Sequence, residues 1–251
     1  MKAYLVFVGI AALLITSSIA KAELSLKPGD YFEYDLHWSF IKVGTAKLET
    51  SKAPLEENGP EYLHVVLTAR TKGIADTLFK VRDRIETWVD PVSGRPIYYK
   101  KKQREGKTKR DIEVYFDWEE GTATYVKNGK QREPIPITWP THNPLSLIIA
   151  ISGSEFDLNN PKTFRTTDGK EVVPIEVSLI KKERIKTSTG KLDALRLDVA
   201  TKELEGVFEK SPDASIQIWL NNSGRKYPIK MKSEVIVGSF HGELTKAVLG
   251  D

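Results

Sequence analysis

Short stretches of alternating apolar and polar residues, found along most of the chain, constrain its fold more than any other feature. In Tyr31–Trp38 apolar side chains occupy every second position from Phe32 onward, with polar residues between them. The same period of two recurs at residues 43–50 and 79–89. This period is typical of strands that bury one face. The sequence therefore predicts a protein built mainly of β-strands.

Turn signals separate these stretches at short intervals. Asn58-Gly59-Pro60 and Gly106 each divide two predicted strands, and Asn128-Gly129 is the strongest short hairpin signal in the chain. Further strands are predicted at residues 62–71, 96–105, 109–118, 122–127, 172–183, 192–201, 214–220, 227–237 and 239–247. Strands spaced this closely favour an all-β sandwich or a curled, barrel-like antiparallel sheet over βαβ units.

One segment has the pattern of a buried helix. Asn143 is a good N-cap, Pro144 suits the first helical position, and Gly153 is a natural end. The residues between them are apolar on nearly every side, which indicates burial. Prolines precede this helix and strands lie on both sides of residues 134–153. We interpret this region as a crossover within one domain, and the alternative is a boundary between two subdomains.

The N-terminus predicts export. Lys2 precedes an apolar run at residues 4–15, and Ala20-Lys21-Ala22 is an A-x-A cleavage pattern. The run is shorter than the roughly 20 apolar residues of a membrane span, which favours a cleaved signal peptide. The alternative is an uncleaved membrane anchor. We therefore expect a signal peptide at residues 1–22 and a single domain at residues 23–251. The mature protein should be periplasmic or otherwise exported, soluble and without a transmembrane segment.

Charge and composition argue against several classes of function. The net charge is +4, and two of the positive charges belong to Lys2 and Lys21, which leaves +2 for residues 23–251. Such a balance does not favour a nucleic-acid partner. The absence of cysteine excludes a cysteine nucleophile, a thiolate metal site and a lipidated N-terminal cysteine. The four histidines lack metal-ligand spacing. We expect no metal, no cofactor and no catalytic residues, and hence a protein that is not an enzyme.

Asp83 is the sharpest local feature, because the alternation places a carboxylate on the apolar face of its strand. A buried charge needs a partner. One interpretation is a polar anchor for the head group of a ligand. The other, which we favour, is an ion pair with an arginine of a neighbouring strand.

A basic cluster surrounds the predicted turn at Gly106. Its members include Lys101, Lys102, Arg104 and Lys107. As one positive hairpin tip, these residues would contact anionic lipid head groups or a phosphorylated glycolipid. The alternative is a solvated hairpin whose lysines discourage pairing with another sheet edge.

A curled sheet with a helix in its interior has room for one apolar ligand. Candidates to line such a cavity come from the apolar strand faces and the helix, although the alternative is an ordinary packed core. The candidate residues are Phe32, Tyr34, Phe79, Val81, Asp83, Ile85, Leu145 and Ile148.

An ordered set of segments resembles the DUF3108 family of exported proteins, whose function is unknown. The set comprises residues 28–35, 43–46, 78–90, 96–99, 101–106, 143–147, 187–194, 216–220, 228–232 and 237–239. The resemblance implies an envelope protein with a single curled antiparallel sheet, similar to an open barrel or β-spiral, and one short buried helix. It supplies no catalytic residues. Asn143 stands where the family pattern favours Asp, and both residues cap helices.

Two functions are consistent with these features. The first is a non-enzymatic periplasmic protein that binds or carries a lipid-like or amphipathic ligand in maintenance of the cell envelope. The second is an interaction module for envelope proteins or polysaccharide, without a ligand cavity.

Overall fold

The computed structural model describes residues 24–200, 215–235 and 238–251. The predicted signal peptide at residues 1–22 lies outside these ranges. The same holds for the ends of three predicted strands, at residues 201, 214 and 236–237.

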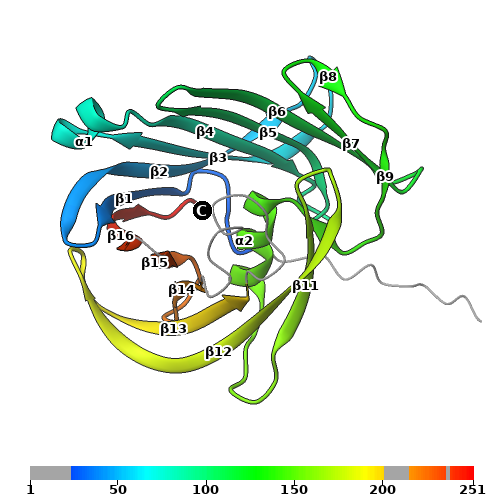
Figure 1. Ribbon diagram of the computed structural model, residues 1–251. Coiled ribbons are helices and arrows are strands. Elements are labelled where there is room, and N and C mark those ends of the chain that lie inside the picture. The colour runs from blue at the N-terminus through cyan, green and yellow to red at the C-terminus, as the bar shows by residue number, and fades with distance from the viewer. Residues whose placement is uncertain (1–23, 201–214, 236–237) are drawn as a thin grey trace, which may run out of the picture.

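The described strands form one large, unclosed sheet that curls around the helix α2 (Figure 1). Its order is β10-β11-β12-β13-β14-β15-β16-β1-β2-β3-β4-β5-β6-β7-β8, with β9 beside β7. Neighbours are antiparallel except the short parallel pair β10 and β11. The expected all-β fold with a single curled sheet is confirmed. The strands are β1 Tyr31–Trp38, β2 Ile41–Pro54, β3 Glu61–Thr71, β4 Arg82–Val89, β5 Pro96–Glu105, β6 Thr108–Asp117, β7 Thr122–Lys127, β8 Lys130–Gln131, β9 Ile135–Pro136, β10 Thr141–His142, β11 Lys162–Thr167, β12 Val172–Thr187, β13 Gly190–Ala200, β14 Ser215–Asn221, β15 Pro228–Val235 and β16 Gly238–Val248.

The alternation seen in the sequence places one face of each long strand in the core. Gly44, Ala46 and Leu48 of β2 are buried in turn, while the residues between them are half-buried. Gly44 is required there, because a Cβ atom would lie 2.2 Å from the carbonyl oxygen of Arg70 on β3. The two strands thus approach closely where the sheet curls.

The predicted helix is present as α2, Pro144–Gly153, and it lies inside the curve of the sheet (Figure 1). Asn143 accepts hydrogen bonds from the backbone N–H groups of Leu145 and Ser146, as an N-cap does. Leu145 and Ile149 pack into one core cluster, and Leu147 and Ile151 into a second. Its all-round apolar character therefore has a structural cause: the helix fills the space between two walls of the same sheet.

A second helix, α1, Gly73–Leu78, was not expected from the sequence. It occupies the connection between β3 and β4 and contributes no buried residue. The strand predicted at residues 79–89 is therefore wrong at its start, because Phe79 ends α1 and β4 begins at Arg82. Among the described residues, neither helix is long and apolar enough to cross a membrane.

Candidate functional site

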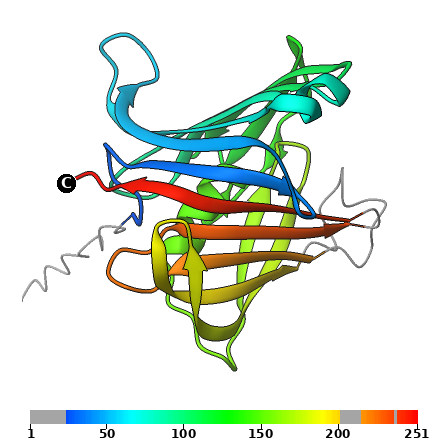
Figure 2. The same cartoon turned by 90° about the vertical axis from the view of Figure 1, so that its left-hand side faces the viewer.

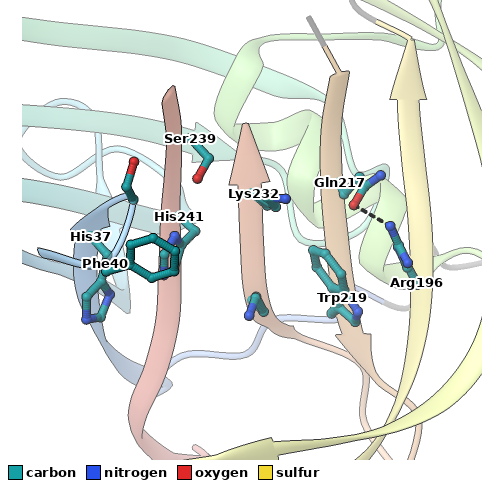
Figure 3. Close-up of a pocket in the computed structure, with 10 residues that line it drawn as sticks. His37, Phe40, Arg196, Gln217, Trp219, Lys232, Ser239 and His241 are labelled. Carbon is teal, nitrogen blue, oxygen red and sulfur yellow. Dashed lines mark hydrogen bonds between the residues drawn. The ribbon is translucent and has the colours of Figure 1, made fainter. Parts of the chain in front are cut away.

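The candidate site is a groove on the face of the sheet that is turned away from α2 (Figure 3). Its floor is formed by side chains from neighbouring strands: His37 of β1 pairs with His241 of β16, and His241 with Lys232 of β15. Lys232 in turn pairs with Gln217 of β14. Strand alternation directs these side chains to one face, opposite the apolar ones that pack on α2. The hollow has a volume of about 690 Å³ and is lined by His37, Ser39, Phe40, Arg196, Gln217, Trp219, Lys230, Lys232, Ser239 and His241.

The far end of the hairpin formed by β12 and β13 bounds this groove, because it folds over the outer face of β14–β16 (Figure 2). The Ser188 hydroxyl donates to the carbonyl oxygen of Leu244 at 2.9 Å. The Trp219 indole N–H donates to Glu183 Oε1, also at 2.9 Å. Trp219 points outward from its strand yet is only 6% exposed. The fold-over thus turns an otherwise open sheet surface into a concave one.

The end of the groove on β13–β15 is cationic. The Arg196 guanidinium lies 5.2 Å and the Lys230 ammonium 5.7 Å from the centre of the Trp219 ring. Arg196 also donates to Gln217 Oε1 at 2.7 Å, which holds the guanidinium along the floor. Lys230 forms an ion pair with Glu243. The groove lining contains three cations and no carboxylate, although Glu243 offsets the charge of Lys230 from beside the lining. The remaining positive charge favours an anionic group.

The other end, on β1 and β16, is aromatic. The imidazoles of His37 and His241 stack with centroids 4.8 Å apart and planes inclined by 12°. Burial lowers the pKa of His241, and the neighbouring His37 lowers it further. Phe40, in the turn between β1 and β2, is 99% exposed. This end therefore presents ring surfaces and, at neutral pH, an uncharged His241.

The groove lacks the arrangement that nucleophilic catalysis needs. Ser39 and Ser239 lie in the same hollow as the two imidazoles. However, in the part of the chain that is described, neither hydroxyl is hydrogen-bonded to a histidine, and an activated serine requires such a base. Within that same part, no three metal-ligating side chains come together. The groove is thus suited to binding, through charge and ring surfaces.

A second, smaller hollow of about 390 Å³ lies between α2 and the strands β10 and β11. It is lined in part by Trp139, His142, Ser146 and Arg165. Burial lowers the pKa of His142 to about 4, which keeps this imidazole neutral. Its walls carry no comparable cluster of cations.

The predicted cavity residues do not line either hollow. Five of them, Phe32, Tyr34, Ile85, Leu145 and Ile148, pack together in one core cluster. The structure thus places these five residues in or against one packed core cluster, and none of them lines either hollow.

The other three predicted cavity residues lie towards the end of the sheet near α1. Phe79 is 55% exposed, and Val81 bridges to Glu105 outside the regular strands. Asp83 accepts a hydrogen bond from the backbone N–H of Arg104 at 2.7 Å. The Glu105 carboxyl is a further neighbour of the Asp83 carboxyl. The favoured ion pair is therefore wrong: among the described residues Asp83 forms no ion pair with an arginine side chain.

The predicted basic hairpin exists as β5 and β6, with Gly106 in its turn at φ 55°. Its cations do not share one face, however. Lys101 pairs with Ile85 and lies on the inner side of the sheet, whereas Lys102 pairs with Arg84 on the outer side. Arg104 is bound to Asp111 at 2.7 Å, and Lys107 is exposed at the turn.

Sequence reasoning did not find the groove. Its residues come from five strands and a turn, spread over residues 37–241. The available signal was the polar face of the strands, where Arg196 stands between the buried Leu195 and Leu197, and Lys230 follows the buried Ile229. Alternation identifies a face, but it does not say which strands are neighbours.

Comparison with known proteins agrees with the fold. The model of DUF3108, described as a protein family of unknown function, matches residues 33–245. No curated protein matches the sequence. A solved β-barrel-like protein of the domain of unknown function DUF1849 from Brucella abortus has a TM-score of 0.58 at 13% identity, covering 90% of this chain and 99% of that one. A putative lipoprotein from Parabacteroides distasonis has a TM-score of 0.39 at 12% identity, with the same coverage of each chain.

Proposed function

The chain belongs to the DUF3108 family, whose function is unknown, and we propose that it is an exported, non-enzymatic binding protein of the cell envelope. Its ligand is an amphipathic, lipid-like molecule with an anionic head group. The head group binds in the groove on the outer face of β13–β16 and β1, not inside the curled sheet.

The observation that carries this proposal is the division of the groove into two chemical halves. Arg196 and Lys230 flank the Trp219 ring at one end, and Phe40 and the stacked imidazoles form the other. A guanidinium and ammonium groups bind phosphate or carboxylate. Ring surfaces next to them accept hydrocarbon. The volume falls in the range of ligand sites, roughly 300–1,000 Å³.

A polysaccharide module is the alternative, and the groove favours it less. Sugar rings stack on open aromatic faces, whereas Trp219 is 6% exposed and covered by the two cations. Phe40 is open, but it stands alone at the end of a turn.

Isothermal titration tests the proposal with three defined probes: dodecyl phosphate, dodecyl maltoside and inorganic phosphate. We expect dodecyl phosphate to bind best, because it alone satisfies both halves of the groove. Arg196→Gln should weaken its binding about tenfold or more, since a charge-assisted hydrogen bond contributes roughly 1.5–3 kcal/mol. The matched control is Arg184→Gln, an exposed arginine of the same hairpin that does not line the groove.

Equal binding of the charged and the uncharged amphiphile would overturn the proposal, as would an equal loss in the two arginine variants. Export is tested separately. Protein recovered from the periplasm of a Gram-negative host should have the mass of a chain that begins at Glu23, and recovery of the uncleaved chain would contradict the predicted cleavage.

A further inference from the structure

Three connections lie at the same end of the sheet, on the right in Figure 2. They are the turn between β1 and β2, the helix α1 and the turn between β5 and β6. The backbone N–H of Lys72, next to α1, donates to Val43 of β2 at 2.9 Å. The N–H of Gly106 donates to Lys80 on the other side of α1 at 2.8 Å. Hydrogen bonds thus fix α1 against the first part of β2, which follows the turn between β1 and β2, and against the turn between β5 and β6.

Large apolar side chains project from this surface. Ile74 and Leu78 of α1 are 82% and 80% exposed, and Phe40 is almost fully so. Together with Ile41 and Phe79 they form what we call the apolar rim. Since α1 buries none of its residues, core packing does not explain its apolar side chains. Clustered exposed apolar residues mark interaction or membrane sites, whereas scattered ones are ordinary.

Cations surround the apolar rim. Residues 39–42, 72–82 and 104–109 contain seven lysines or arginines and only two acids. Asp76, one of the acids, is bound by Arg82 at 2.6 Å. Lys72, Lys80, Lys107 and Lys109 are exposed and form no ion pair within the described part of the chain. We call these four the lysine collar.

We propose that this end of the protein docks on an anionic lipid bilayer. The apolar rim enters the boundary between head groups and acyl chains, and the lysine collar contacts the head-group phosphates. Apolar side chains backed by Lys or Arg are the pattern of interfacial membrane binding, and each Lys near an anionic surface adds to the attraction. Charge complementarity thus selects a lipid surface with a negative charge.

Docking goes beyond the proposed function and does not require it. The two are nevertheless adjacent, because Phe40 belongs to the apolar rim and also lines the groove. A docked protein would hold one end of its groove at the lipid surface.

Vesicle co-sedimentation tests the docking. Vesicles of phosphatidylglycerol and phosphatidylcholine in equal amounts are compared with pure phosphatidylcholine. We expect the wild type to bind the mixed vesicles and Ile74→Ser/Leu78→Ser to bind about tenfold less, because each exposed side chain loses burial in lipid. The matched control is Val92→Ser/Leu158→Ser, which removes two exposed apolar side chains outside the rim. All forms share the same N-terminus, so their differences report the rim.

The lysine collar is tested in the same assay. Lys72→Gln/Lys80→Gln/Lys107→Gln should lose the preference for phosphatidylglycerol, whereas Lys27→Gln/Lys52→Gln/Lys182→Gln, with the same change of net charge, should keep it. Vesicle binding that is unchanged in the rim variants, or equally reduced in the controls, would overturn the docking.

Two further measurements distinguish membrane docking from self-association through the apolar rim and from ligand binding in the groove. A wild-type dimer in sedimentation velocity that Ile74→Ser/Leu78→Ser converts to a monomer, without vesicle binding, would mean that the rim contacts a second copy and would overturn docking. Ile74 and Leu78 do not line the groove, so titration of this variant with dodecyl phosphate should match the wild type whatever the vesicles show.

Discussion

Asp30 and Arg225, which are 195 positions apart, form an ion pair in which the carboxylate is completely buried. The same carboxylate accepts the backbone N–H of Gly250 at 2.8 Å and that of Lys27 at 2.8 Å. One side chain therefore joins the start of the described chain, the connection between β14 and β15, and the C-terminal end. It locks together the strands that form the middle of the sheet.

Asp30→Asn should destabilise the protein by about 3–5 kcal/mol, because it leaves Arg225 without its counter-charge in a buried site. The measurement is the free energy of unfolding from a urea titration. Asp35→Asn is the control, since the pair of Asp35 with Lys42 is partly exposed and such pairs contribute roughly 0–1 kcal/mol. Similar losses in the two variants would contradict the special role of Asp30.

Asn and Asp are not equivalent at position 143 of this protein, although both residue types cap helices and the sequence alone does not distinguish them. The Asn143 amide donates to the Thr87 hydroxyl at 2.8 Å, and that hydroxyl itself donates to the carbonyl oxygen of Tyr98. An aspartate would keep the cap but lose this donor in a fully buried site. We expect Asn143→Asp to cost about 1–3 kcal/mol in the free energy of unfolding. A neutral effect would show that the bond to Thr87 contributes nothing.

His142 should make the protein less stable as the pH falls. Burial lowers its pKa to about 4 from an ordinary 6.5, so below pH 6.5 the unfolded chain binds a proton that the folded protein refuses. This contribution is fully present above pH 6.5 and is lost down to about pH 4, at roughly 1.4 kcal/mol per unit of pH. Urea titrations of wild type and His142→Gln at several pH values isolate the effect. The difference in stability between the two should change over this window, and a constant difference would contradict the prediction.

Asp83 should act in the opposite direction. Its pKa is raised from 3.8 to about 6, first by burial and then by the nearby Glu105, against the hydrogen bond from the Arg104 backbone N–H. A raised pKa stabilises the folded state at low pH, and this stabilisation is lost as the pH rises from about 4 through about 6. Asp83→Asn keeps the acceptor for Arg104 and removes the charge. It should unfold at a higher temperature than the wild type at neutral pH and at nearly the same temperature at pH 4.

The sequence by itself determined the local structure of this protein. The alternation from Phe32 onward identified the strands and their buried faces, because a period of two is a property of each strand alone. Asn143, Pro144 and Gly153 identified α2, since capping involves only neighbouring residues. Helix α1 was missed because it has only six residues and its apolar side chains, Ile74 and Leu78, lie outside the core, so no buried stripe marks it.

Only the tertiary structure decided which strand faces pack together and where the surface of the protein forms a groove. His37, Arg196 and Trp219 share a groove because β13, β14, β15, β16 and β1 are successive neighbours in the sheet and the hairpin of β12 and β13 folds over the outer face. Phe32 and Leu145 became core and not cavity because α2 fills the curl of the sheet. Such contacts depend on the pairing of distant segments. A strand pattern specifies the face on which a side chain lies, but not its neighbours across the sheet.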